Sequence, residues 1–139
     1  MTGRLFAAPA RQSRQRERLN LSWAEELSMW AFVAQSEPAF PLLTKLWRSP
    51  YGPELELNRE GQDALLMELD KLEATVRALV ESSEASRRLK DFVRGFRKKY
   101  PNASVDGVSV DAALRGTQNM KKFLEVSKTR GWMVYNVVD

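Results

Sequence analysis

The sequence contains neither cysteine nor histidine. Without cysteine, the chain can form no disulfide, no thiolate nucleophile and no cysteine-built zinc or iron–sulfur site. Without histidine, it lacks the usual general base at neutral pH and the commonest protein ligand of transition metals, and an ordinary serine triad is excluded. We therefore expect a protein that is not an enzyme and that uses no cofactor and no metal.

Other catalytic chemistries stay open in principle, because a lysine-activated serine and a carboxylate-bound Mg²⁺ need neither residue type. No pattern favours them. The seven glycines are scattered and build no phosphate-binding loop. Ser109, in the segment Gly107-Val108-Ser109-Val110, lacks the second glycine of a nucleophile elbow.

Long apolar runs are also missing. No stretch approaches the roughly 20 apolar residues of a membrane span, and the N-terminus lacks the apolar core of a secretory signal. At 139 residues and 43% hydrophobic content, the chain has the size and composition of one folded domain. We expect a cytoplasmic protein with no membrane span.

The net charge of +4 lies at the start of the chain, where residues 1–18 hold five arginines and one glutamate. The rest of the chain is balanced. We expect residues 1–19 to form a flexible basic arm and residues 20–139 a single helical domain. An arm that orders on a partner, or an organelle transit peptide, is the alternative interpretation.

Apolar residues at helical spacing predict an all-α, bundle-like fold of four or five helices. The first spans 21–36, begins with a capping box of Ser22 and Glu25, and is apolar around most of its circumference. Such a helix is either deeply buried or covered by a partner. The others follow Pro41, run from the cap Asn58 to about residue 81, and span 84–100 and 110–130. A break is possible at Gly116. Residues 132–138 favour an extended end.

The middle of the chain is electrically polarised. Residues 54–84 hold nine acidic and three basic side chains, whereas residues 87–99 hold seven basic and one acidic. A solvated helical hairpin with complementary faces explains this pattern without any function. The functional interpretation is an acidic surface that attracts a basic protein such as a toxin or enzyme, with nearby aromatic anchors. The predicted contacts are Glu56, Glu60, Asp63 and Asp70, with Trp47 and Tyr51 as anchors.

A nucleic-acid interface is the competing hypothesis for the same region. Basic side chains of the fourth predicted helix could follow phosphates, and Tyr100 beside them could stack on a base. The candidate residues are Arg87, Arg88, Arg94, Arg97, Lys98 and Lys99. No helix-turn-helix, RNA-recognition or zinc-finger signature accompanies them.

Two stretches resemble patterns in small bacterial helical proteins. One runs from Pro41-Leu42-Leu43 through Leu46-Trp47 to the leucine-rich segment 65–69, and the other from Lys122-Phe123-Leu124-Glu125 to Gly131. Proteins of this kind include immunity and accessory factors paired with secreted toxins. The resemblance implies a non-catalytic module that binds and blocks a cognate toxin. A nucleic-acid-associated accessory protein and a structural subunit of a larger assembly are the alternatives.

Overall fold

The computed structural model describes residues 5–48 and 55–136 of the chain. Most of these residues are helical, as the sequence predicts. A 3₁₀ helix, η2 (Ala34–Ala39), joins the first two α-helices. The α-helices are α1 (Trp23–Val33), α2 (Pro41–Arg48), α3 (Arg59–Glu81), α4 (Ala85–Lys99) and α5 (Val110–Arg130).

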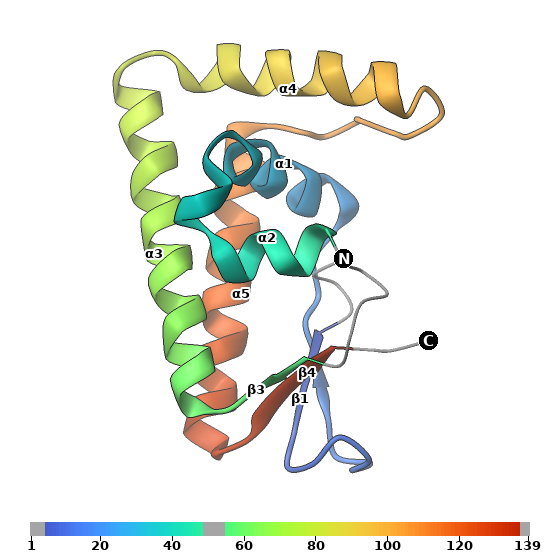
Figure 1. Ribbon diagram of the computed structural model, residues 1–139, viewed down its shortest axis with the longest axis vertical. Helices are drawn as coiled ribbons and strands as arrows, with labels where there is room; N and C mark the ends of the chain where they lie inside the picture. Colours follow the sequence, from blue (N-terminus) through green and yellow to red (C-terminus); the bar gives the residue numbers. More distant parts are fainter. Residues whose placement is uncertain (1–4, 49–54, 137–139) are drawn as a thin grey trace.

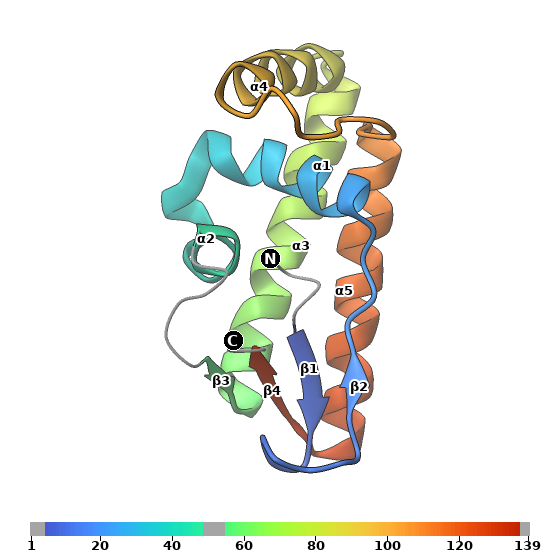
Figure 2. The ribbon, with the colours of Figure 1, turned by 90° about the vertical axis from the view of Figure 1, so that its right-hand side faces the viewer.

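The fold is not purely α-helical, because the described residues also form a four-stranded antiparallel sheet of order β2-β1-β4-β3. Its strands are β1 (Leu5–Ala8), β2 (Glu17–Arg18), β3 (Glu56–Leu57) and β4 (Met133–Asn136). The predicted extended C-terminal segment therefore has a partner: β4 lies between β1 and β3, next to the lower ends of α3 and α5 (Figures 1 and 2).

The expectation of a flexible basic arm is wrong for residues 5–18, which supply β1 and β2. All four residues of β1 are buried, and Phe6 packs against Tyr135 of β4 with ring centroids 5.4 Å apart. Two of the arginines join this packing. Arg11 donates hydrogen bonds to the carbonyl oxygens of Asn136 (2.7 Å) and Leu55 (2.9 Å), and Arg16 lies 4.3 Å over the Phe6 ring. Burial of the apolar strand is compatible with these two nearby charges because the guanidinium groups of Arg11 and Arg16 both keep a partner.

The long helices α3 and α5 lie side by side and antiparallel, and α1 crosses them (Figures 1 and 2). The leucine seam of α3 is buried as its heptad spacing predicts, with Leu65, Leu69 and Leu72 fully enclosed. Gly116 does not interrupt α5. A Cβ there would lie 2.6 Å from Sδ of Met29, so this glycine lets α1 and α5 approach closely.

Helix α4 does not form the hairpin with α3 that the charge pattern favours. Ser83 has a left-handed backbone (φ 61°), and after it α4 turns away and lies across the upper end of the molecule (Figure 1). The residues of α4 that become buried are Ala85 and Leu89, both near its start. The rest of its apolar face is left above α1, and this arrangement creates the site described next.

Candidate functional site

Three aromatic side chains on α4 and its C-cap follow one helical stripe without becoming buried. Phe92, Phe96 and Tyr100 are spaced four residues apart, and their neighbouring ring centroids are 5.9 and 5.0 Å apart. Tyr100 is 48% exposed. A stripe with this spacing normally packs against a neighbouring helix. Here it faces a hollow between α4, α1 and α2.

The opposite wall of this hollow is also aromatic. Helix α1 supplies Trp23 and Trp30, and α2 supplies Trp47, whose ring centroid is 5.7 Å from that of Trp30. The Trp23 ring lies 6.3 Å from Phe96, and its indole N–H donates to the carbonyl oxygen of Ser104 at 2.8 Å. That bond ties the loop after α4 to the start of α1.

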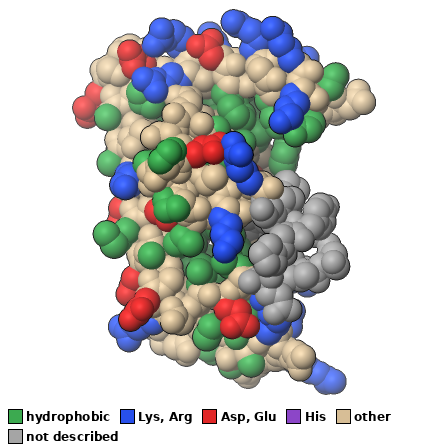
Figure 3. All heavy atoms as spheres, viewed as in Figure 1, with side chains coloured by type: hydrophobic (Ala, Val, Ile, Leu, Met, Phe, Trp, Pro, Cys, Tyr) green, Lys and Arg blue, Asp and Glu red, His purple; other side chains and the backbone are tan. Residues whose placement is uncertain are grey.

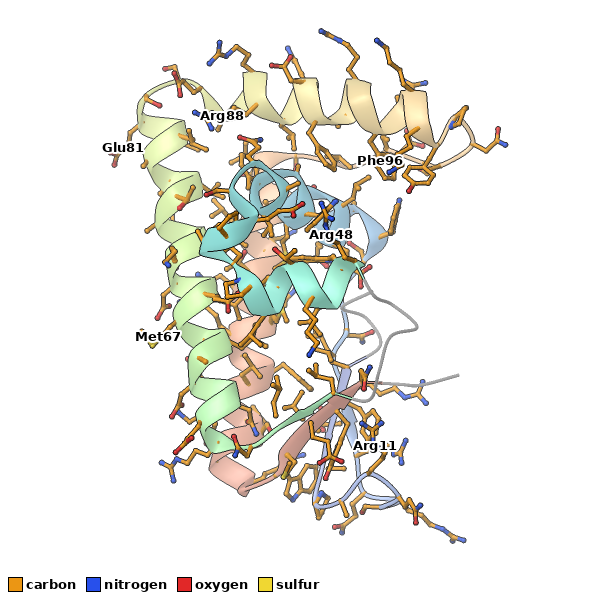
Figure 4. The ribbon with its side chains drawn as sticks, viewed as in Figure 1. Arg11, Arg48, Met67, Glu81, Arg88 and Phe96 are labelled. Atoms are coloured by element: carbon orange, nitrogen blue, oxygen red, sulfur yellow. The ribbon has the colours of Figure 1, made fainter. Side chains whose placement is uncertain are left out.

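We call this hollow the aromatic groove. It has a volume of about 1020 Å³, and Figure 3 shows hydrophobic side chains gathered below α4 with basic ones near them. Figure 4 shows Phe96 projecting from α4 towards this space, with Arg48 at the end of α2 below it. Its aromatic lining residues are Trp23, Trp30, Trp47, Phe92, Phe96 and Tyr100.

A buried carboxylate holds the first turn of helix α2 in place. Glu68 of α3 accepts hydrogen bonds from the backbone N–H groups of Leu42 (3.0 Å) and Leu43 (3.0 Å) in the first turn of α2. These donors would otherwise have no partner in the helix. The capped helix then presents Trp47 to the groove. The Trp47 indole nitrogen is buried and has no hydrogen-bond acceptor among the described residues.

Charged side chains also line the aromatic groove. Glu26 is 4% exposed and already has an interaction partner in the protein. Arg48 pairs with Glu37 at 2.5 Å while its side chain stays 62% exposed. On α4, Asp91 lies 3.9 Å from Arg94, both well exposed, and Lys99 lies 5.6 Å from the centre of the Tyr100 ring. The exposed charged residues that line the groove are therefore Arg48, Lys99 and Asp91, and Asp91 has Arg94 beside it.

Gly95 lies on the same part of α4, between the aromatic residues. A Cβ built at this position would meet no described atom within 4 Å. Glycine in the interior of a helix is less stable than alanine by roughly 0.8–1 kcal/mol. The packing of the described residues gives no reason for this cost, whereas a partner that approaches α4 closely would give one.

The predicted acidic contacts lie elsewhere, and two of them are paired within the fold. Asp63 forms an ion pair with Lys128 of α5, and Asp70 pairs with Lys121 at 2.6 Å. Glu56 and Glu60 are exposed near the sheet. Of the predicted anchors, Trp47 lies in the aromatic groove and Tyr51 lies outside the described residues.

Glu73, one turn beyond Asp70, completes this link between α3 and α5. It lies 3.4 Å from Lys121 and 3.2 Å from Arg77. Burial alone would raise the pKa of Glu73, but the hydrogen bond from Arg77 and the charge of Lys121 together lower it. The hydrogen bond to Asp70 raises the pKa of Lys121. Much of the acidic face of α3 therefore serves the packing of α5.

The six basic candidates all lie on α4 but spread around its circumference. Arg87 and Arg88 pair with Glu84 at 3.6 and 3.4 Å. Arg94 and Arg97 edge a second hollow of about 690 Å³ on the other flank of the helix. Lys98 is exposed, and Lys99 edges the aromatic groove. They do not form one continuous strip for a phosphate backbone.

Comparisons with protein-family models, curated proteins and solved structures found no match. The function must therefore be inferred from the chemistry of the groove. Among residues 5–48 and 55–136, no three acidic side chains gather where they could hold a metal ion. Within the same ranges, no helix has the length and apolar character needed to cross a membrane.

Two of the six aromatic residues of the groove have a predicted contact role, Trp47 as an anchor and Tyr100 as a ring that could stack on a base, whereas the other four do not. Two signals pointed towards them. The first helix is apolar around most of its circumference, which predicts cover by the core or by a partner. The fourth helix holds aromatic residues spaced four apart and seven basic side chains between and around them. Part of its apolar stripe therefore has to lie beside basic side chains.

Proposed function

We propose that this protein is a non-catalytic binding module that recognises another protein through the aromatic groove. The observation that carries the proposal is the convergence of six partly exposed aromatic side chains from three helices on one hollow. Aromatic residues dominate the binding energy of protein interfaces, especially where they line a pocket that a partner can fill. Contiguous apolar surface of this kind on a folded domain marks an interaction site.

The shape of the groove favours a macromolecule over a small ligand. Pockets for small molecules enclose most of the ligand surface and usually have volumes of about 300–1,000 Å³. The aromatic groove, at about 1020 Å³, lies just above that range. It also leaves Trp23 38% and Tyr100 48% exposed at its edge. A protein segment that lay along α4 would cover both rings.

The experiment is a pull-down with the tagged protein from its native cell, with nuclease added and at low and high salt. We compare the wild type with Phe96→Ala, which shortens a groove side chain, and with Met67→Ala. Met67 is a matched control because it is apolar and 72% exposed, but lies on α3 away from the groove (Figure 4). The proposal expects one protein to be retained by the wild type and Met67→Ala and lost from Phe96→Ala. Equal retention by all three would contradict it.

Within this class of proteins we propose an immunity- or antitoxin-type role, in which the module blocks a cognate toxin. The resemblance of residues 41–69 and 122–131 to small bacterial immunity and accessory proteins supports this role. Its test is growth rescue, with the protein expressed together with a toxin encoded beside it. Rescue by the wild type and by Met67→Ala, but not by Phe96→Ala, would connect the role to the aromatic groove. No rescue by any of them would rule out that toxin as the target.

Nucleic-acid binding is a second candidate, because Arg97 and Lys98 are exposed beside Tyr100 at the end of α4. The same pull-down separates the two. Phosphate binding that involves 6–10 contacts weakens by roughly 10³–10⁵ between 50 and 200 mM salt. Retention of nucleic acid alone, lost on nuclease or salt treatment, would favour this candidate. A structural subunit would instead elute with its assembly in size-exclusion chromatography.

A further inference from the structure

We infer that the aromatic groove accepts an acidic amphipathic helix of the partner protein. This inference rests on the proposed function and specifies the chemistry of the partner. Three observations carry it: the geometry of the walls, the charges at the edge of the groove and the open space at Gly95.

The walls of the groove favour a helix over an extended segment. An extended peptide needs hydrogen-bond partners for its backbone, which it usually finds at an open sheet edge. The groove is lined by side chains of α1, α2 and α4 and of the segment just after α4, whereas the sheet lies at the opposite end of the molecule (Figure 1). A helix satisfies its own backbone and needs only an apolar face. Since α4 has 15 residues, it is about 22 Å long, which matches four turns of a docked helix.

The spacing of the aromatic residues fits the same mode of binding. Phe92, Phe96 and Tyr100 repeat every four residues on one wall, and Trp23 and Trp30 lie seven residues apart on the other. A helix that docks in a groove inserts side chains at positions i, i+3 or i+4, and i+7. The rings on each wall therefore repeat with the period of such anchors.

The charges at the edge select an acidic partner. Of the basic side chains of α4, Lys99 lines the groove, together with one exposed acidic side chain, Asp91, whose charge is offset by Arg94 at 3.9 Å. On the facing wall, Arg48 remains well exposed beside Glu37. Glu26 is buried and already has an interaction partner in the protein, so it adds little to the outer surface. A helix in the groove would hold its polar flanks beside Arg48 and Lys99, where glutamate and aspartate are favoured.

Gly95 is the point at which the docked helix comes closest to α4. The position has no side chain and no described atom within 4 Å of a Cβ. In close helix pairs, small residues let two backbones approach, and any added atom pushes them apart. The glycine thus has a purpose in the complex that it lacks in the free protein.

The test uses three synthetic 16-residue peptides without tryptophan or tyrosine, so that the tryptophan emission of the protein reports binding. The first has leucine and phenylalanine at positions i, i+4 and i+7 and glutamate elsewhere on the helix. The second keeps these apolar positions and replaces glutamate with lysine. The third has the composition of the first in scrambled order. We expect the first alone to change the emission saturably and to gain helical circular dichroism, with at least about tenfold tighter binding than the second.

Two substitutions locate the binding and separate charge from shape. Lys99→Glu is expected to weaken the acidic peptide about three- to tenfold, in the range for reversing an exposed charge pair, whereas Met67→Ala should leave binding unchanged. Equal or tighter binding of the lysine peptide, or no binding of either, would overturn the inference. So would an oligonucleotide that binds more tightly than the acidic peptide. The proposed function fails separately, if the pull-down retains no protein that depends on Phe96.

Discussion

Replacement of Gly95 by alanine is expected to stabilise the free protein. Gly95 lies inside α4, where a Cβ would meet no described atom within 4 Å, so the new methyl group causes no clash. The gain is then the helix propensity of alanine over glycine, roughly 0.8–1 kcal/mol in the free energy of unfolding. For a chain of 139 residues, this corresponds to an increase in Tm of about 3–5 °C.

Urea unfolding followed by circular dichroism measures this gain, and the slope m should not change. Gly131→Ala is the matched control. A Cβ at Gly131 also meets no described atom within 4 Å, but its φ is +69° at the C-cap of α5. Alanine there adopts the left-handed conformation at a cost of roughly 1 kcal/mol. Substitution of glycine by alanine should thus stabilise the protein at Gly95 and destabilise it at Gly131, although the space around both positions is equally open. A loss of stability in Gly95→Ala would refute the reasoning.

The same variant links stability to binding. If a partner helix approaches α4 at Gly95, the added methyl group overpacks the interface, which typically costs 1–3 kcal/mol and hence weakens the acidic peptide at least about fivefold. We therefore expect a variant that unfolds later and binds less tightly. Unchanged affinity for the acidic peptide would show that no partner helix approaches α4 closely at Gly95. The stability gain expected for Gly95→Ala does not depend on this result.

Three further substitutions test contacts that hold the helices together. Gly116→Ala should destabilise the protein by about 1–3 kcal/mol, measured by urea unfolding, because the new Cβ would lie 2.6 Å from Sδ of the buried Met29. Glu68→Ala leaves the first N–H groups of α2 without their acceptor. We expect the free energy of unfolding to fall by about 1–3 kcal/mol and tryptophan emission to shift to the red. An unshifted spectrum would show that α2 keeps its place without the cap. Because the pKa of Glu73 is lowered below 4.5 in the fold, its contribution to stability is present above pH 4.5 and lost as the pH falls through the lower folded value. The urea midpoint of Glu73→Gln should accordingly depend less on pH than that of the wild type between pH 5 and 3, and parallel curves would contradict the assignment.

The helices follow from local signals in the sequence. The predicted capping box is present, with the Glu25 N–H donating to the Ser22 hydroxyl at 3.1 Å and the Ser22 N–H donating to the Glu25 carboxylate at 2.9 Å. Asn58 caps α3 and Gly131 ends α5 in the left-handed conformation. Each of these signals acts within one helical turn, so a single sequence is enough to interpret it.

The sheet could not be predicted in the same way. Its strands have two to four residues, too few for an alternating pattern, and β1 includes two alanines, which disfavour strands. Its pairing with β4 depends on a segment at the other end of the chain. The arginines after β1 made the segment look like a solvated tail, although Arg11 and Arg16 stack on aromatic rings of the sheet.

The aromatic groove was missed for a related reason. The sequence places Phe92 and Phe96 on an apolar stripe, and such a stripe usually belongs to the core. Whether it is buried depends on the direction in which α4 leaves α3 after Ser83, which no periodicity encodes. Similarly, the charge pattern predicts that the acidic side chains of α3 form a surface for a partner, but the lysines that pair with them are on α5, about 50 to 65 residues later in the chain.

The pairing of β1 with β4 also has a consequence for the order in which the chain can fold during synthesis. About 125 residues separate the two strands, so at roughly 5–20 residues per second β1 waits about 6–25 s for its main partner. During that interval the apolar residues of β1 have only the short β2 beside them, and an unpaired strand edge invites aggregation. Arg11, Arg14 and Arg16 follow directly after β1. Charged side chains beside an unpaired strand disfavour its pairing with other chains, and two of these, Arg11 and Arg16, later become part of the finished sheet.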